Sequence, residues 1–400
     1  MLKTADITLA RRIEAVKPSA TLAVAAKAEG LLRAGRDIIN LSVGEPDFDT
    51  PVHIKEGAIR AIQAGHTKYT AVDGIPLLKE AIVEKFKREN QLVYQPNQII
   101  VSSGAKHSLF NLFTVLLNPG DEVIIPAPYW TSYPEMITLF DAKPIIVKTT
   151  LNDHFKLSPD QLTRVITKRT RLIILNSPTN PTGMAYSKDE LAALATVLIH
   201  HPHILIASDD IYEHHLWQHL PFSNIVNAYP ELYNRTLVIN GVSKTYAMTG
   251  WRIGYAAGPK EIISAMKKAQ SQSTSNPCSI SQYAALAALT GDQQCVSQMT
   301  KAYHERHNYL VGEIKKIRGF EVLPSDGTFY SFPSVEKLCG IRKEIDSDIT
   351  FAEYLLNEAG VAVVPGSAFG ASKMIRLSYA TKMDHLKEAI IRIKNAIQSW

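Results

Sequence analysis

Six short apolar runs in the middle of the chain constrain its fold most strongly. They are nearly continuous in Ile, Val and Leu, as expected for strands buried on both faces of a sheet. The runs are Ile99–Ser102, Glu122–Ile125, Pro144–Val147, Leu172–Leu175, Ile204–Ala207 and Leu237–Ile239. Helix-length segments lie between several of them, such as Ser108–Leu117 and Lys188–Ile199. The alternation predicts an α/β fold, in which a largely parallel sheet is covered by helices on both sides.

One connection is too short for this pattern. Only ten residues separate Asn240 from Trp251, and a further strand-like run, Arg252–Ala257, follows at once. A parallel crossover usually needs about a dozen residues or more. We therefore expect the last run to be antiparallel, which gives a mixed, mostly parallel sheet of seven strands.

The pattern changes after about residue 295. A long charged helix is predicted over Thr300–Arg318, and a final amphipathic helix over Met383–Gln398. Short strands are predicted between them at Phe329–Phe332, Val361–Val364 and Met374–Leu377. We expect a large domain of residues 49–295, and a smaller α/β domain of residues 296–400 together with the N-terminal residues 1–48.

Composition argues against several kinds of partner. The 400 residues carry a formal net charge of +5, and no basic run stands out, which disfavours nucleic acid. The three cysteines, Cys278, Cys295 and Cys339, are far apart, which indicates a reducing compartment without disulfides. Residues 1–12 lack the apolar core of a secretory signal, and no stretch approaches the roughly 20 apolar residues of a membrane span. We expect a cytoplasmic protein that binds no membrane.

Histidines occur close together at His200 to His203 and at His214 and His215. They lack supporting cysteine or acidic ligands at regular spacing, so we expect no metal site.

A lysine in a small-residue turn carries the strongest chemical signal. Lys244 follows the apolar run Leu237–Ile239, and Arg252 comes eight residues later. Partial burial favours the neutral amine, which can attack a carbonyl, and an arginine can grip a phosphate with two hydrogen bonds. The pair therefore predicts a site for pyridoxal 5'-phosphate, with Lys244 bound to its aldehyde. The alternative is an ordinary solvated surface lysine.

Other strand ends offer matching groups. Ser102–His107 follows a strand and opens a helix, where backbone N–H groups can bind an anion, although a turn without a ligand is the alternative. Asp209 ends a buried strand and can pair with a pyridine nitrogen, with Tyr212 near the ring oxygen. An N-cap role for Asp209 is the alternative, and Asp210 can take that role instead.

Three further residues have both a functional and a structural interpretation. Asn180 lies in a turn-forming segment after a strand and can donate to a ring oxygen or a substrate carboxylate. Trp130 can cover a planar ring, or it can be an ordinary core or interface aromatic. Arg376 lies in an apolar strand and needs an anionic partner, which is either a structural carboxylate or that of a substrate.

These motifs, in their order along the chain, resemble the class I pyridoxal-phosphate-dependent aminotransferases. The resemblance spans essentially the whole chain, and it is closest to the bacterial aspartate aminotransferases of subgroup Ib. The segments that carry it are Asn180–Gly183, Asp209 to Tyr212, Ser243–Lys244 and Arg252, with support from Leu41–Pro51, Lys68–Thr70 and Pro128–Trp130. It implies the type I fold of these enzymes and a homodimer with two shared active sites. It also implies transfer of the amino group of L-aspartate to 2-oxoglutarate by a ping-pong mechanism, giving oxaloacetate and L-glutamate.

The resemblance also implies a role for each site residue. Lys244 would form the aldimine and shuttle the proton, with Asp209 on the pyridine nitrogen and Tyr212 on the ring oxygen. The rest of the cofactor site would comprise Asn180 on the ring oxygen, Trp130 on the ring face, Gly104, Ala105, Lys106, Ser243 and Arg252 on the phosphate, and Tyr69 from the neighbouring subunit. The substrate α-carboxylate would be bound by Arg376, Asn180 and the backbone of Gly44, with Trp130 beside the substrate.

One departure from the better known subgroup Ia bears on the substrate. Those enzymes bind the distal carboxylate with an arginine from the partner subunit, and the matching segment here, Ser273–Pro277, has none. Subgroup Ib enzymes use a lysine of the phosphate loop with N-terminal hydroxyls instead. Lys106, Ser19 and Thr21 match that pattern, so we expect them to bind the side-chain carboxylate of an acidic substrate.

Other functions fit parts of the same sequence. Enzymes of this fold also act on alanine, aromatic amino acids, kynurenine, prephenate or arogenate, and some are C–S lyases. A nucleotide-dependent oxidoreductase is a different class, but no G-x-G-x-x-G motif opens the first βα turn. A non-catalytic binding protein of the same fold would normally carry a DNA-binding module, for which the chain leaves no room.

Overall fold

A seven-stranded sheet forms the centre of the molecule. The computed structural model describes residues 7–217, 221–398 and 400. The strands follow the spatial order β2-β8-β7-β6-β5-β3-β4. Their bounds are β2 Ile99–Ser102, β3 Glu122–Ala127, β4 Lys143–Lys148, β5 Thr170–Asn176, β6 Leu205–Asp209, β7 Thr236–Gly241 and β8 Gly254–Ala257. β8 is antiparallel to both of its neighbours, and the other pairs are parallel. Both the mixed sheet of seven strands and its antiparallel member are confirmed.

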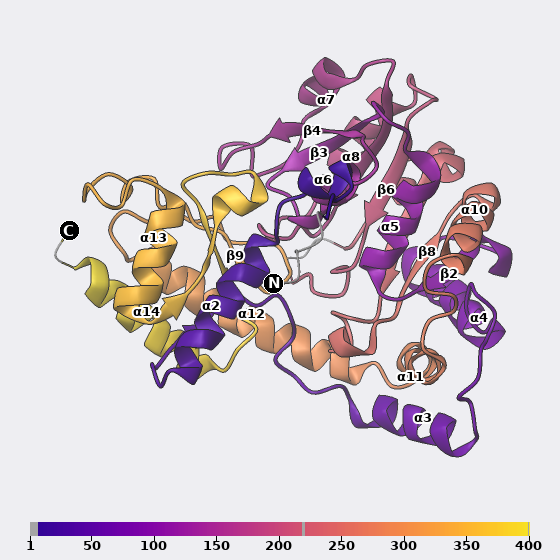
Figure 1. The fold of residues 1–400 in the computed structure, drawn as a ribbon, viewed down its shortest axis with the longest axis horizontal. Helices are drawn as coiled ribbons and strands as arrows, with labels where there is room; N and C mark the ends of the chain where they lie inside the picture. Colours follow the sequence, from indigo (N-terminus) through magenta and orange to yellow (C-terminus); the bar gives the residue numbers. More distant parts are fainter. Residues whose placement is uncertain (1–6, 218–220, 399) are drawn as a thin grey trace, which may run out of the picture.

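Except in the edge strand β4, most side chains on both faces of the strands are buried, which explains the continuous apolar runs. In β5, Leu172 and Ile174 pack into one apolar cluster, and Ile173 and Leu175 pack into another on the opposite face. Helices cover the first face at α5 Ala105–Leu116, α6 Ser132–Thr138 and α10 Lys260–Ser271. The second face is covered by α4 Pro76–Lys85, α7 Pro159–Val165, α8 Lys188–Leu198, α9 Ile225–Ala228 and α11 Ser279–Thr290, while α3 Val52–Gln63 lies against α11 (Figure 1).

The predicted strand Arg252–Ala257 is wrong at its start, because β8 begins at Gly254. Arg252 adopts a left-handed backbone conformation with φ of 56°, which is uncommon for a residue with a side chain. This conformation takes Arg252 out of the sheet. Its side chain lies instead beside the turn between β2 and α5, where it bonds to Ser103.

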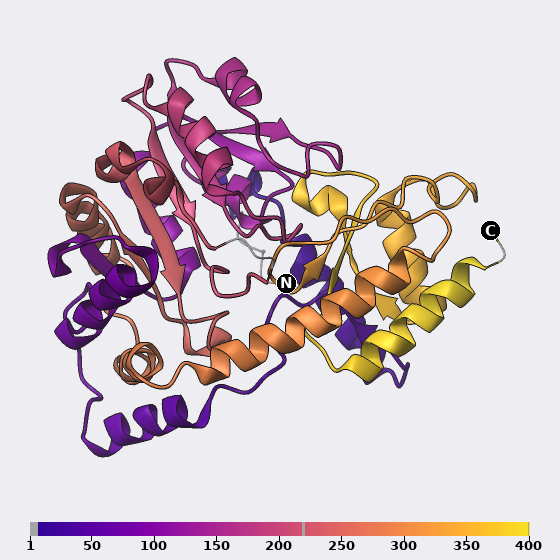
Figure 2. The same ribbon diagram turned by 180° about the vertical axis from the view of Figure 1, so that it is seen from behind.

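A smaller set of strands and helices combines segments from before and after the large sheet in the chain. It contains β9 Tyr330–Ser331, β11 Val364–Pro365 and β12 Ile375–Ser378 in one sheet, and β1 Ile39–Asn40 paired with β10 Val361–Ala362 in another. The helices are α2 Ala20–Arg33, α12 Gln294–Ile314, α13 Asp348–Tyr354 and α14 Met383–Ile397. Figure 2 shows α12 running from the region of the large sheet to the C-terminal helices. The proposed boundaries of the two domains stay a prediction.

The long helix was predicted over Thr300–Arg318, and both ends of that prediction are wrong. α12 begins at Gln294, whose backbone N–H donates a hydrogen bond to the Asp292 carboxylate at 3.0 Å. It ends at Ile314, before the left-handed Gly319. The predicted strand Val361–Val364 is divided between β10 and β11.

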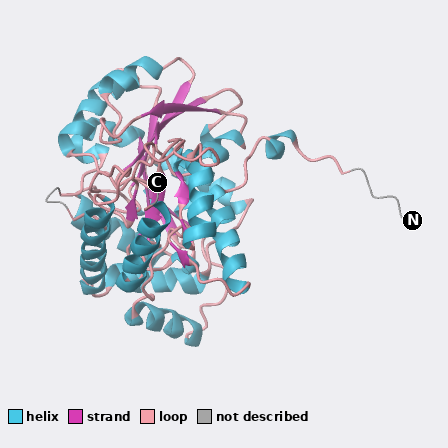
Figure 3. Cartoon of the chain, turned by 90° about the vertical axis from the view of Figure 1, so that its left-hand side faces the viewer, coloured by secondary structure: helices cyan, strands magenta, loops and turns pink. Residues whose placement is uncertain are grey.

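The N-terminal segment leaves the body of the molecule. Figure 3 shows α1, Arg11–Glu14, standing away from the remaining elements. Its apolar side chains are exposed: Ile7 is 81% exposed and Leu9 59%. Within the described part of the chain, no helix is long and apolar enough to cross a membrane.

Candidate active site

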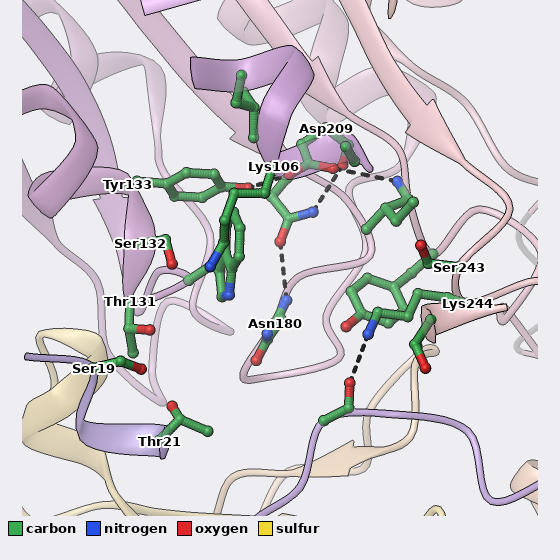
Figure 4. A pocket seen from close by; sticks show the side chains of 18 of the residues that line it. Ser19, Thr21, Lys106, Thr131, Ser132, Tyr133, Asn180, Asp209, Ser243 and Lys244 are labelled. Carbon is green, nitrogen blue, oxygen red and sulfur yellow. Dashed lines mark hydrogen bonds between the residues drawn. The ribbon is translucent and has the colours of Figure 1, made fainter. Parts of the chain in front are cut away.

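The carboxyl ends of several parallel strands open into one cavity. It has a volume of about 300 Å³ and lies where β5, β6 and β7 end and where α5 begins. This edge is the usual ligand-binding edge of such a sheet. All of the predicted site residues except Gly104 and Tyr69 line it: Ser19, Thr21, Gly44, Ala105, Lys106, Trp130, Asn180, Asp209, Tyr212, Ser243, Lys244, Arg252 and Arg376. Figure 4 shows how many of these side chains point toward one another.

Lys244 presents its amine inside this cavity. Its Nζ donates a hydrogen bond to the backbone carbonyl of Gly44 at 2.6 Å. Burial lowers the pKa of Lys244 to about 8, against the opposing effect of Glu45, and the positive charges of Arg376 and Arg252 act in the same direction as burial. The structure therefore supports a reactive amine rather than a solvated surface lysine.

Asp209 lies at the end of β6 and is 4% exposed. Its Oδ2 accepts a hydrogen bond from the Tyr133 hydroxyl at 2.6 Å, and its Oδ1 accepts a longer one from the Ile211 N–H at 3.4 Å. Burial raises its pKa to about 6, and these two bonds and the charge of Lys244 oppose the rise. No helix begins at this position, so the N-cap alternative does not hold.

Asp210, the other proposed cap, points into a buried polar cluster instead. Its carboxylate accepts hydrogen bonds from Ser208 at 2.7 Å and from the Asn224 amide at 3.1 Å. It does not line the cavity. The two adjacent carboxylates thus occupy separate environments, and only Asp209 faces the space where a ligand would lie.

Arg376 combines deep burial with an incomplete set of partners. The side chain is 1% exposed; Nη1 donates to Asn180 Oδ1 at 3.0 Å, and Nη2 donates to the Ser42 carbonyl at 2.6 Å. Its Nε has no partner within the described residues, and no described carboxylate forms an ion pair with it. A buried guanidinium that keeps its charge without an anion lacks its natural partner. A carboxylate entering the cavity would supply that partner.

Two tyrosines at the site were not anticipated from the sequence. The Tyr330 hydroxyl lies 2.9 Å from the Tyr212 hydroxyl, and the Tyr330 ring lies 4.4 Å from the Arg376 guanidinium. Tyr133 bonds to Asp209, and its only sequence signal was its position three residues after Trp130. Contact between Tyr212 and Tyr330 joins distant parts of the chain, so no local pattern could indicate it.

A second group of residues forms a positively charged region of the cavity. Gly104 has φ of 91°, and a Cβ at this position would lie only 2.3 Å from Nη2 of Arg252. Arg252 is held by bonds from Nη1 to the Thr249 carbonyl at 2.9 Å and from Nη2 to the Ser103 carbonyl at 3.4 Å. Burial and the charge of Arg252 lower the pKa of Lys106. Two cations beside the N-terminus of α5 make a site for an anion such as a phosphate, which fits the predicted cofactor.

The predicted side-chain carboxylate site lies opposite Asp209 in the cavity. Figure 4 shows Ser19 and Thr21 on that side, with Thr131 and Ser132, which were missed, next to them. Ser19 precedes α2 and its Oγ accepts a weak bond from the Leu22 N–H at 3.4 Å. Lys106 Nζ lies 4.9 Å from the centre of the Trp130 ring.

Tyr69 does not belong to the cavity of its own chain. Its side chain is 92% exposed and lines a surface groove with Thr274, Asn276 and Cys278. Its predicted contact with the phosphate therefore requires a second copy of the chain.

Away from the cavity, side chains of Glu89, Glu213 and His214 offer ligand atoms that all lie within 4.8 Å of one another. The histidine thus has acidic neighbours, which sequence spacing alone did not indicate. The buried Lys85 ammonium also binds Glu213 and lies 3.7 Å from Glu89. Lys85 and Arg88 together balance the charges of the two carboxylates, so the cluster is explained as an ion-pair network.

Comparisons with known proteins agree with this geometry. The family described as aminotransferase class I and II matches residues 36–393. The chain belongs to this family. It is 54% identical over 394 residues to the aspartate/prephenate aminotransferase of Nitrosomonas europaea, covering 97% of this chain and 99% of that protein. It is 49% identical to the aspartate aminotransferase of Geobacillus stearothermophilus over 98% of this chain and 99% of that protein.

Solved structures show the same relation. The aspartate aminotransferase of Rhizobium meliloti superimposes with a TM-score of 0.95 at 47% identity, over 98% of both chains. The aspartate aminotransferase of Thermus thermophilus with maleate gives a TM-score of 0.93 at 44% identity, covering 98% of this chain and all of the other. The predicted fold class is confirmed. The protein is an aminotransferase that depends on pyridoxal 5'-phosphate, and the oxidoreductase and non-catalytic alternatives are set aside.

Proposed function

We propose that this aminotransferase moves the amino group of L-aspartate to 2-oxoglutarate, giving oxaloacetate and L-glutamate in two half-reactions. The observation that carries the proposal is that one cavity holds two separate cations free of carboxylate partners, Arg376 and Lys106, among the described residues. A substrate with two carboxylates satisfies both. Relatives named aspartate aminotransferase, and a similar structure that contains the dicarboxylate maleate, support the proposal.

The α-carboxylate would bind at Arg376. Its unpaired Nε supplies one donor, and the Asn180 amide and the Gly44 backbone lie at the same end of the cavity. At the other end, Lys106 would bind the side-chain carboxylate with help from the hydroxyls of Ser19 and Thr21.

Bound pyridoxal phosphate supplies an electron sink for the negative charge that develops at the substrate Cα. Lys244 would move a proton between the substrate Cα and the aldehyde carbon of the cofactor, because its lowered pKa allows both directions near neutral pH. Asp209 would hold the proton on the ring nitrogen. Tyr212 and Asn180 would donate to the ring oxygen.

The remaining residues of the cofactor site would orient it. The phosphate would lie against Arg252, Ser243 and the backbone amides of Gly104, Ala105 and Lys106 at the start of α5. Trp130 would cover one ring face.

A larger acceptor such as prephenate is the second candidate function. A neighbouring cavity of about 250 Å³ shares Ser19, Lys106, Thr131 and Ser132 with the first. This extra space lies beside the proposed site of the side-chain carboxylate. Relatives named aspartate/prephenate aminotransferase favour this candidate for the same reason.

We also propose a cytoplasmic homodimer in which Tyr69 reaches the phosphate of the partner's site. Exposed apolar side chains on α3, Ile59 at 51% and Ile62 at 52%, together with those of the N-terminal segment, support a covered surface. Sedimentation of the purified protein would test the dimer. Tyr69→Phe should weaken pyridoxal phosphate binding by about threefold to tenfold, the loss of one hydrogen bond.

A direct assay tests the activity. Purified protein with pyridoxal phosphate, L-aspartate and 2-oxoglutarate should form oxaloacetate, and Lys244→Ala should form none. A C–S lyase would instead release ammonia, and it would not need a 2-oxo acid as acceptor. Replacing 2-oxoglutarate by prephenate in the same assay tests the second candidate.

A further inference from the structure

Tyr133 is a buried residue whose hydroxyl has a single partner among the residues that the structure describes. It lies in the first turn of α6, its side chain is 2% exposed, and its hydroxyl donates to Asp209 Oδ2 at 2.6 Å (Figure 4). We propose that Tyr133 is a positioning residue, which fixes the Asp209 carboxylate and lowers its basicity and thereby tunes the proton on the cofactor ring. The inference rests on the proposed role of Asp209.

The contact leaves one carboxylate oxygen available. A carboxylate has about four acceptor sites on its two oxygens. Tyr133 occupies Oδ2, whereas from the described part of the chain Oδ1 receives only the long bond from the Ile211 N–H at 3.4 Å. Because Tyr133 determines which oxygen is engaged, it also determines which one is offered to a ring nitrogen.

The position of Tyr133 is itself fixed by packing. Its ring meets the Trp130 ring edge-to-face, with centroids 5.3 Å apart and an interplanar angle of 87°. Its backbone N–H donates to the Trp130 carbonyl at 3.0 Å. One turn of chain therefore sets both the aromatic face over the proposed ring site and the donor to Asp209.

The electrostatics agree with this geometry. Burial, and then the negative charge of Asp209, raise the pKa of the Tyr133 hydroxyl well above its usual value, so it stays a donor at every relevant pH. The other titratable groups that act on the pair are Lys244, Tyr212 and Asp210. Of these, Lys244 favours the ionised form of Asp209 together with the Tyr133 bond. Removing that bond should make Asp209 more basic.

Tyr133→Phe tests the proposal because it removes one oxygen and keeps the ring. Tyr94→Phe is the matched control, since the Tyr94 hydroxyl is also buried but has no partner among the described residues. The first readout is thermal unfolding of the full chain without cofactor, compared at about pH 5 and about pH 8.

The sign of this effect follows from the raised pKa of Asp209. A carboxyl group whose folded pKa lies above its unfolded value costs stability as the pH rises between the two, and the full cost is present above the folded pKa, here about 6. Tyr133→Phe raises that pKa further, so its Tm deficit should be larger near pH 8 than near pH 5. Tyr94→Phe should show the same small change at both. An equal deficit for Tyr133→Phe at both pH values would indicate packing alone and overturn the proposal.

The second readout is the pH midpoint of the visible absorption band of the bound cofactor. A more basic Asp209 withdraws the ring proton, which makes the ring less electron-poor, so the midpoint of Tyr133→Phe should rise. Pyridoxal phosphate should also bind about threefold to tenfold more weakly, because the lost bond acts on the cofactor indirectly, through Asp209.

Asp209→Asn separates this inference from the function on which it rests. If Asp209→Asn moves the midpoint and Tyr133→Phe does not, the proposal for Tyr133 is wrong and the role of Asp209 stands. If neither variant moves it, the role of Asp209 fails and the inference fails with it. A rise in both, with no change in Tyr94→Phe, supports the proposal.

Discussion

The two cations proposed to bind substrate are built in opposite ways. Arg376 comes from β12, is buried, and is held by Asn180 and by the Ser42 carbonyl before any ligand arrives. Lys106 comes from the first turn of α5, is exposed, and its ammonium lies over the Trp130 ring. An α-carboxylate is common to every amino acid, whereas side chains differ. A rigid cation suits the constant group, and an adjustable one suits the variable group.

The largest effect is expected for a substitution of Arg376, the rigid cation. Arg376→Lys keeps a charge but loses the planar fork and leaves the Asn180 side chain without its donor. The change should raise the activation free energy that corresponds to kcat/KM by roughly 2–5 kcal/mol. The increase should be the same for aspartate and alanine, because both have an α-carboxylate. Steady-state kinetics with both donors measures this. A loss confined to aspartate would show that Arg376 does not bind the α-carboxylate.

A substitution of Lys106, the adjustable cation, should lower kcat/KM mainly for aspartate and not for alanine. Lys106→Met removes the ammonium and keeps an unbranched side chain over Trp130. We expect kcat/KM for aspartate to fall by roughly 1.5–3 kcal/mol, about tenfold to more than a hundredfold, because a charge-assisted bond is lost. Alanine should change far less when pyridoxal phosphate is saturating. An equal loss for both donors would contradict the assignment of Lys106.

Raising the pH should weaken binding of the side-chain carboxylate at Lys106 in the unmodified protein. Burial and the charge of Arg252 lower the pKa of Lys106 from its ordinary value of 10.5. An ammonium with a lowered pKa loses its charge at a lower pH. The preference for aspartate over alanine should therefore decline severalfold as the pH rises toward the lowered pKa of Lys106. Lys106→Arg stays charged and should keep its preference across the range. A flat preference in the wild-type chain would contradict the prediction.

The smallest effect is expected at the N-terminal hydroxyls. Thr21→Val removes one hydroxyl from the wall of the cavity and keeps the branched shape. The expected loss is about 0.5–1.5 kcal/mol in kcat/KM for aspartate, with alanine unchanged. Competition between the two donors in one reaction resolves a difference of this size. A loss for alanine as large as that for aspartate would place Thr21 outside the side-chain site.

The sheet could be predicted from sequence because the signal is local. Continuous apolar runs such as Leu172–Leu175 occur only where both faces are covered, and the short link after Asn240 forces an antiparallel neighbour. Asp209 and Lys244 could be found for the same reason, because Asp209 ends one buried strand and Lys244 follows another. Both residues are identified from a pattern of consecutive residues.

The remaining features depend on contacts between distant segments. The pairs Tyr133 with Asp209 and Tyr212 with Tyr330 are separated by 76 and 118 residues, so no periodicity reveals them. Arg252 was predicted inside a strand, but its backbone is left-handed because the side chain must reach the turn at Gly104. The place of Tyr69 depends on a second copy of the chain, which a single sequence does not describe.

The absorption spectrum of the purified protein with pyridoxal phosphate, titrated with L-aspartate in the absence of any 2-oxo acid, tests the central claim most directly. If the cavity holds an acidic substrate between Arg376 and Lys106, the visible band should disappear as the amino group is taken up, at a lower concentration of aspartate than of alanine. A visible band that alanine removes and aspartate leaves unchanged would contradict the claim, because the cofactor site would then be intact without a place for the second carboxylate.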